Sequence, residues 1–146
     1  YLTQRRKDAE IDICMNIHRS LGPGLLESVY EKVLCHELAL AKIEFRSQQP
    51  INLFYKILVI PHAYRADIIV EGKLVVELKS CESITPVHQK VLLTYLRLSN
   101  IKLGLLVNFG SALLKDGIRR VVNNFNWLSP SRNAKVASYS ERQAIQ

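Results

Sequence analysis

The stretch that organises this chain runs from residue 64 to residue 79 and reads Tyr64-Arg-Ala-Asp-Ile-Ile-Val-Glu-Gly-Lys-Leu-Val-Val-Glu-Leu-Lys79. Segments 64–70 and 74–78 are rich in β-branched and aliphatic residues, as strands are. The segment 71–73 between them holds a glycine that can take positive φ. The stretch therefore predicts a β-hairpin.

Two carboxylates and an amine stand in this hairpin where strands favour apolar residues. If the loop is the three residues 71–73, Asp67 lies directly opposite Glu77, with both side chains on one face of the sheet. Lys79 follows two residues later and points to that same face. A two-residue loop would shift the register by one and send Asp67 to the opposite face. The loop length therefore decides whether the three side chains meet.

This triad indicates a metal-dependent phosphodiesterase site. Like charges opposite one another are destabilising, and a partly buried carboxylate pair cannot stay fully ionised without compensating positive charge. A divalent cation and the Lys79 ammonium would supply that charge. The alternative is a solvated polar face of an edge hairpin with an ordinary surface ion pair. The spacing alone leaves both interpretations open.

Length and composition predict one globular domain, which we place at residues 1–128, followed by a polar, flexible tail at 129–146. No apolar run is long enough to span a membrane, and the N-terminus lacks the apolar region of a secretory signal. The 3 cysteines have neither disulfide nor zinc-ligand spacing, and we expect Cys14 and Cys35 to be small core residues. We therefore expect a cytoplasmic protein with no membrane contact.

The net charge of +7 favours a polyanionic partner. Much of it lies in the two ends of the chain, where basic residues are more often solvated than bound to nucleic acid. The candidates for phosphate contacts within the body are Lys90, Arg97, Lys102, Lys115, Arg119 and Arg120.

Periodicity and turn signals predict alternating helical and extended regions along the chain. Thr85 caps the third helix and Pro86 is its first residue. Segment 117–125 stays open between strand and helix. The predicted elements are helices at 9–21 and 25–42, strands at 43–49 and 51–60 that end at Pro50 and Pro61, the hairpin, a helix at 85–98, a strand at 102–109 and a short helical turn at 111–115.

Three side chains on the helices are further candidates. Gln89 shares a helical stripe with Leu92, Leu93 and Leu96, so its amide bonds either the carboxylate cluster or a loop backbone. Glu27 and Tyr30 share one face in the first turns of the second helix. For Glu27 the alternative is simple charge–dipole stabilisation, and for Tyr30 it is a core position with a satisfied hydroxyl.

These residues together resemble the GxxExxY protein family, a branch of the PD-(D/E)xK nuclease-like superfamily. The resemblance spans roughly residues 10–125. It implies an α/β fold with a restriction-endonuclease-like core, in which helices flank a mixed sheet of about four strands in αβββαβ order. The matching motifs are Gly24-x-x-Glu27-x-x-Tyr30, Arg65-Ala-Asp67, Glu77-Leu-Lys79, Gln89 and Gly104-Leu-Leu-Val-Asn-Phe109.

The resemblance also implies roles for individual residues. Asp67 and Glu77 would ligate Mg²⁺ or Mn²⁺ together with the backbone carbonyl of Leu78, and Lys79 would orient and help deprotonate the attacking water. Gln89 would hold that water or a phosphate oxygen, and Glu27 would be a further metal ligand or would orient one. The family pattern has proline where this chain has Ala66, a position that supplies no ligand.

Two classes of function follow. The first is a Mg²⁺-dependent nuclease that hydrolyses phosphodiester bonds, with DNA favoured over RNA as substrate. The second is a non-catalytic nucleic-acid-binding or assembly protein on the nuclease scaffold, including a homodimer that buries the site, because fold does not fix function. All the implied chemical residues are present, which favours the enzyme.

Overall fold

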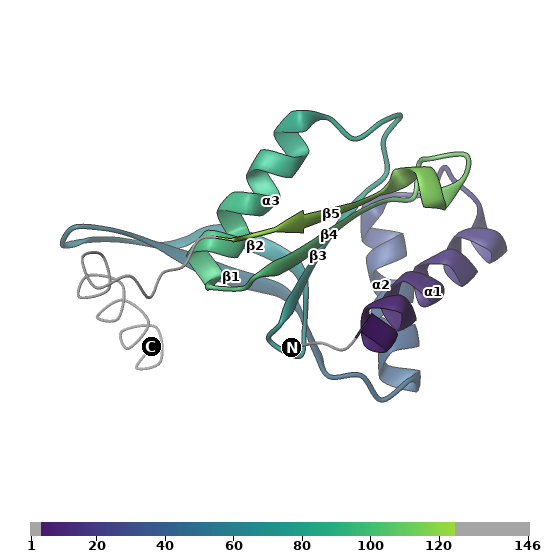
Figure 1. The fold of residues 1–146 in the computed structure, drawn as a ribbon, viewed down its shortest axis with the longest axis horizontal. Coiled ribbons are helices and arrows are strands. Elements are labelled where there is room, and N and C mark those ends of the chain that lie inside the picture. Colours follow the sequence, from purple (N-terminus) through teal and green to yellow (C-terminus); the bar gives the residue numbers. More distant parts are fainter. Residues whose placement is uncertain (1–3, 125–146) are drawn as a thin grey trace.

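One mixed sheet with the strand order β1-β2-β3-β4-β5 organises the protein (Figure 1). The computed structural model describes residues 4–124. Helix α3 covers one face of the sheet, and α1 and α2 cover the other. The elements are α1 (Gln4–Leu21), α2 (Glu27–Leu40), β1 (Phe45–Tyr55), β2 (Leu58–Val70), β3 (Leu74–Lys79), α3 (Pro86–Ser99), β4 (Leu103–Asn108), the 3-10 helix η1 (Leu114–Gly117) and β5 (Ile118–Val122).

Strand β3 lies in the middle of the sheet and is buried on both faces. It pairs antiparallel with β2 and parallel with β4, to which α3 provides the crossover. Leu74, Val76 and Leu78 pack towards α1 and α2, whereas Val75 packs towards α3. The alternation expected of a strand therefore divides the core into two layers, and it confirms the predicted α/β class.

The hairpin formed by β1 and β2 is longer than the sequence indicated. We predicted that strands would end at Pro50 and Pro61, but both prolines lie inside strands. β1 is an edge strand, and the pairing of β2 with β3 runs only from Ile68 to Val70. Proline lacks an amide hydrogen, and at a sheet edge that hydrogen has no ladder partner to lose. Both prolines are therefore tolerated where a central strand would end.

The sheet also gains a strand beyond the four that we expected. Segment 117–125, which the sequence left open, contributes β5, and the short helical turn expected at 111–115 lies instead at η1. β5 pairs antiparallel with β4, from Leu103 opposite Val122 to Val107 opposite Ile118. The predicted tail at 129–146 lies outside the described residues.

Two further expectations concern the membrane and the cysteines. Within residues 4–124, no helix has both the length and the apolar character needed to cross a bilayer. All three cysteines are free, and Cys14 is buried in the core, as expected, whereas Cys35 is partly buried and packs against the core. Burial, followed by the charge of Glu10, raises the pKa of Cys14 to about 12, so its thiol stays protonated.

Tyr30 fixes the loop that leads into α2. Its side chain is fully buried, and its ring stacks on Phe109 with centroids 4.3 Å apart. Its hydroxyl donates a hydrogen bond to the carbonyl of Gly22 and accepts one from the N–H of Leu25 at 3.2 Å. Gly24 takes a φ of 112°, a conformation open mainly to glycine. These contacts confirm Tyr30 as a core residue with a satisfied hydroxyl.

We predict that Tyr30→Phe destabilises the protein by about 1–3 kcal/mol, because the ring stays in place while two backbone groups lose their buried partner. Chemical denaturation measures the loss. The matched control is Tyr55→Phe, since Tyr55 is 62% exposed and its substitution should change stability by less than about 0.5 kcal/mol. Equal losses in the two variants would contradict the assigned role.

Candidate active site

The β2–β3 hairpin has the register on which the site depends. Its ladder pairs Val70 with Leu74, Ile69 with Val75 and Ile68 with Val76. The loop is the three residues 71–73, and both Glu71 and Gly72 have positive φ, of 51° and 64°. The three-residue loop is confirmed, and the next step of the same register brings Asp67 across from Glu77.

At that step, hydrogen bonds to the Asp67 and Glu77 side chains replace the backbone hydrogen bonds between β2 and β3. The N–H of Asp67 donates to Oε1 of Glu77 at 3.0 Å, and the N–H of Leu78 donates to Oδ2 of Asp67 at 2.9 Å. Beyond this point the two strands diverge, with β2 running out along β1 and β3 continuing beside β4 up to Lys79 (Figure 1). The two carboxylates therefore lie at the opening of a V between the strands.

Burial and mutual repulsion make this carboxylate pair hold on to a proton. Burial, followed by the charge of Asp67, raises the pKa of Glu77 to about 8. Burial also raises the pKa of Asp67, while the Leu78 N–H and the Lys79 charge oppose that rise. The two carboxyl groups share a hydrogen bond. A single proton held between them is what two buried like charges require when no cation is bound.

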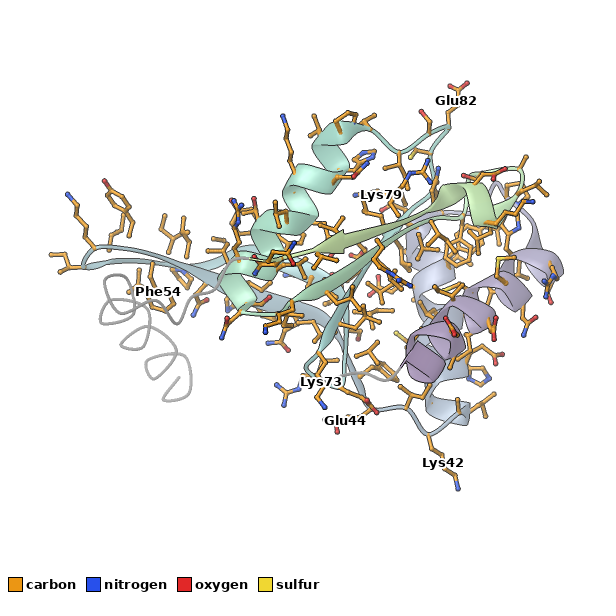
Figure 2. The ribbon with its side chains drawn as sticks, viewed as in Figure 1. Lys42, Glu44, Phe54, Lys73, Lys79 and Glu82 are labelled. Atoms are coloured by element: carbon orange, nitrogen blue, oxygen red, sulfur yellow. The ribbon has the colours of Figure 1, made fainter. Side chains whose placement is uncertain are left out.

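A small cavity of about 60 Å³ opens beside the pair, between β3, β4 and α3. Its polar lining consists of Glu77, Lys79 and His88, and the rest is apolar, namely Val91, Leu92 and Leu106. Lys79 projects from the end of β3 (Figure 2) and acts electrostatically on both carboxyl groups. The sequence-predicted triad of Asp67, Glu77 and Lys79 is thus brought together.

The structure places His88, not Gln89, on the inner face of α3. The buried stripe of the helix is Leu92 and Leu96, and His88 precedes Leu92 by four residues. Gln89 is exposed and does not line the cavity. The expectation that Gln89 lies on the packed stripe is therefore wrong, because one residue corresponds to a 100° rotation about the helix. Its role in holding a water or a phosphate oxygen stays a prediction.

His88 itself was missed by sequence reasoning. Thr85 is the N-cap of α3, as expected. Its N–H donates to Nδ1 of His88 at 3.1 Å, so a neutral His88 ring carries its proton on Nε2. The available signal was its spacing of four and eight residues from Leu92 and Leu96, which puts it on their face.

Tyr95 is a second residue that sequence reasoning did not find. Its ring makes an edge contact with Tyr64 of β2, with centroids 5.1 Å apart. Burial raises the pKa of Tyr95, and the charges of Glu77 and Asp67 raise it further. The phenol therefore lies within electrostatic reach of the carboxylate pair, on the same helix as His88 and seven residues further on.

Glu27 approaches the site from α2 but does not join the two carboxylates. Its Oε1 accepts a hydrogen bond from the N–H of Ser80 at 3.3 Å, and the Ser80 hydroxyl donates to the carbonyl of Leu25 at 2.6 Å. Its charge contributes to the raised pKa of Asp67. In the described part of the chain, no three His, Cys, Asp or Glu side chains are grouped so that they could hold a metal ion. This geometry favours an orienting role for Glu27.

Asn108 braces the chain that follows Lys79. Its Oδ1 accepts hydrogen bonds from the N–H groups of Cys81 (3.0 Å) and Gly110 (3.1 Å), and its Nδ2 donates to the Cys81 carbonyl at 2.9 Å. A Cβ at Gly110 would lie 2.3 Å from that carbonyl oxygen, so the close approach requires glycine. The sequence motif containing Asn108 was recognised, but this bracing contact needed the parallel pairing of β3 and β4.

The predicted phosphate-binding residues do not form one cluster. Lys90 and Arg97 are exposed on α3, seven residues apart and so on one helical face. Arg119 and Arg120 are neighbours on β5 and point to opposite faces of the sheet, and their contacts with phosphates stay predictions. Nη1 of Arg119 donates to the carbonyls of Asp116 and Ile118. Lys102, Lys115 and Arg65 are exposed, and their contacts with phosphates stay predictions.

We predict that the metal-free protein loses stability as the pH rises from about 4.5 towards 8. In the unfolded chain Glu77 ionises near its ordinary value of 4.5, whereas in the folded protein it stays protonated up to about 8. The stability that its raised pKa contributes is therefore present at low pH and is lost as the pH rises. Thermal unfolding across this range should show a flatter profile for Glu77→Gln, and an unchanged slope would contradict the assignment.

A family model described as the PD-(D/E)XK nuclease superfamily matches residues 4–121. No curated protein and no solved structure gives a significant match. The family match covers most of the chain, and the five-stranded mixed sheet flanked by helices agrees with a restriction-endonuclease-like fold. The protein therefore belongs to the PD-(D/E)XK nuclease superfamily.

Proposed function

We propose that this protein is a metal-dependent nuclease that hydrolyses phosphodiester bonds of DNA in the cytoplasm, with Mg²⁺ or Mn²⁺ as cofactor. We also assign it to the GxxExxY branch of its superfamily. The observation that carries the proposal is the buried pair of Asp67 and Glu77, which lie together at the opening between β2 and β3 with Lys79 beside them.

The donor set suits a hard divalent cation. One oxygen of Asp67 and one of Glu77 accept backbone N–H groups, which fixes both carboxylates in place. The two carboxyl groups retain a proton because it removes the repulsion between their negative charges, and a bound cation would remove the same repulsion. The Leu78 N–H points towards Asp67, and in an extended strand the carbonyl of the same residue points to the same side. Two carboxylates and one carbonyl are oxygen ligands that leave room for water.

Each residue has a role that follows from its position. Asp67 and Glu77 would hold a divalent cation, which would acidify a water molecule and neutralise the negative charge that develops on the phosphate oxygens. Lys79 borders the cavity next to Glu77. Its ammonium group is a hydrogen-bond donor only, so it orients the attacking water by donating to the water oxygen. His88 presents its Nε2–H to the phosphate, and Glu27 orients the chain that follows Lys79.

Substrate contacts are proposed for the exposed face of α3. Lys90 and Arg97 lie on the helix that covers the cavity, so phosphates of a bound strand can meet them while the scissile phosphate enters beside Lys79. Gln89 is exposed on the same helix and can reach such a strand. Binding of this kind is expected to weaken steeply with salt.

We predict that the purified protein cleaves DNA with Mg²⁺ or Mn²⁺, and that Asp67→Asn and Lys79→Ala each lower the rate by roughly a hundredfold or more. The assay uses single-stranded, duplex and branched DNA. Lys73→Ala is the matched control, because Lys73 is an exposed lysine at the far end of the same hairpin (Figure 2).

The competing class is a non-catalytic binding or assembly protein, and the same assay separates the two. Wild-type protein that stays inert on every substrate with Mn²⁺ present, or Lys79→Ala protein that keeps full activity, would remove the nuclease proposal. Unchanged far-ultraviolet circular dichroism of the variants shows that lost activity is not lost folding.

We further predict that Mn²⁺ raises the melting temperature of the wild-type protein, and raises it more at pH 8 than at pH 6. Metal binding must displace the proton on the carboxylate pair, so affinity increases as the pH approaches the pKa of Glu77, about 8. Glu77→Gln should abolish the shift, whereas Glu82→Gln, at an exposed carboxylate outside the cavity, should retain it. A shift that persists in Glu77→Gln would place the ion elsewhere.

A further inference from the structure

The outer part of the β1–β2 hairpin, residues 52–63, projects from the body of the protein, and we call it the arm. Figure 1 shows it extending well beyond the edge of α3. Its two strands pair with each other up to the turn, where Tyr55 lies opposite Leu58. The pairing of β2 with β3 begins only at Ile68. The arm is therefore a two-stranded ribbon, a form that is marginally stable in water unless something packs against it.

The tip of the arm exposes apolar side chains. Ile57 is 95% exposed, Tyr55 62% and Leu58 54%. Lys56 lies over the Tyr55 ring, with its ammonium 5.5 Å from the centroid. Two-residue turns favour asparagine and glycine, yet this turn has Lys56 at a φ of 55° followed by Ile57. The two turn positions thus carry a cationic and a branched apolar side chain, although asparagine and glycine would fit a two-residue turn with less backbone strain.

The arm has a built-in bend. The β1–β2 register shifts between Ile51 and Leu53, and the Oδ1 of Asn52 accepts a hydrogen bond from the N–H of His62 at 2.9 Å. His62 has a positive φ of 53°. Bulges of this kind bend a two-stranded ribbon and increase its twist. The hydrogen bond from the His62 N–H to Asn52 stabilises this bend.

The charge of the arm and its base points to a polyanionic partner. Residues 45–66 contain Arg46, Lys56 and Arg65, and they contain no Asp or Glu. Two arms meeting tip to tip would bring two copies of Lys56 together, so self-association through the tips is electrostatically unfavourable. Apolar side chains flanked by cations on a β-ribbon are suited to a DNA groove, where isoleucine and similar residues wedge against base steps.

We propose that the arm is a second DNA-binding element, in which Ile57 and Tyr55 enter the minor groove of a duplex while Lys56 and Arg65 contact its phosphates. Nine residues of β2, 58–66, lie between Ile57 and Asp67, and the bulge takes up two of them, so the separation corresponds to roughly 25 Å of strand. This distance is less than one helical turn of duplex DNA, so a duplex longer than one turn can contact both places. The proposal rests on the nuclease function in one respect, namely that the same duplex occupies the cleft at Asp67.

The test is a comparison of duplex lengths. The arm variant Lys56→Asn/Ile57→Gly removes the cation and the hydrocarbon, and asparagine tolerates the positive φ of position 56. The control Leu40→Ala/Lys42→Asn changes an exposed leucine and an exposed lysine with a φ of 56°, at the opposite side of the protein (Figure 2). Binding to duplexes of about 12 and about 30 base pairs is measured by fluorescence anisotropy in an Asp67→Asn background, so that no strand is cut.

We expect the arm variant to bind the long duplex about tenfold more weakly, with a salt dependence reduced by about one phosphate contact, while its affinity for the short duplex is unchanged. The control variant should match the parent protein on both. Equal affinity of arm variant and parent for the long duplex, or an equal loss on both lengths, would overturn the proposal. Sedimentation that shows a dimeric parent and a monomeric arm variant would overturn it too, in favour of a surface for a second copy.

The outcomes separate this inference from the nuclease proposal. If wild-type protein cleaves DNA but the arm variant binds the long duplex normally, only the arm proposal fails. If no substrate is cleaved and the length-dependent loss of binding is still seen, the nuclease proposal fails and the arm remains a DNA-binding element.

Discussion

Two hydrogen bonds between side chains and backbone hold β2 and β3 together where their ladder ends, and the site depends on them. The carboxylates of Asp67 and Glu77 take over the bonding that the strands' own N–H and C=O groups provide further along. The strands can then separate without leaving these amides unsatisfied, which would be costly in a buried position. The opening that results is where α3 meets the sheet and where Lys79 borders the cavity.

The same arrangement holds the carboxyl groups of Asp67 and Glu77 close enough to repel each other when both are ionised. Two buried carboxyl groups that share a proton are stable at low pH, and loss of that proton leaves two like charges close together in a buried position. The surrounding contacts, from Asn108 to Cys81 and from Glu27 to Ser80, keep the end of β3 from relaxing away from this repulsion. A site held in this way is organised before it meets a substrate, which is how preorganised electrostatics assists catalysis.

Strong local signals made much of the fold predictable. The Glu71-Gly72-Lys73 loop fixed the register by turn chemistry, and Thr85 with Pro86 marked the start of α3. The failures arose where the outcome depended on neighbours distant in sequence. Pro50 stays in a strand because β1 is the edge strand, and Pro61 does so because β2 pairs with β3 only from Ile68 to Val70. β5 forms by pairing with the side of β4 that β3 does not occupy.

The sequence by itself determined the hairpin, the meeting of Asp67 with Glu77 and the position of Lys79, because the period of two along a strand and the length of a loop are local properties. Only the tertiary structure decided which side chains of α3 complete the site. His88 and Tyr95 reach it while Gln89 does not, because the rotation of a helix about its axis is set by packing against the sheet, here by Leu92 against Gly104. It alone also revealed the arm, since projection from a sheet depends on where the neighbouring strand stops pairing.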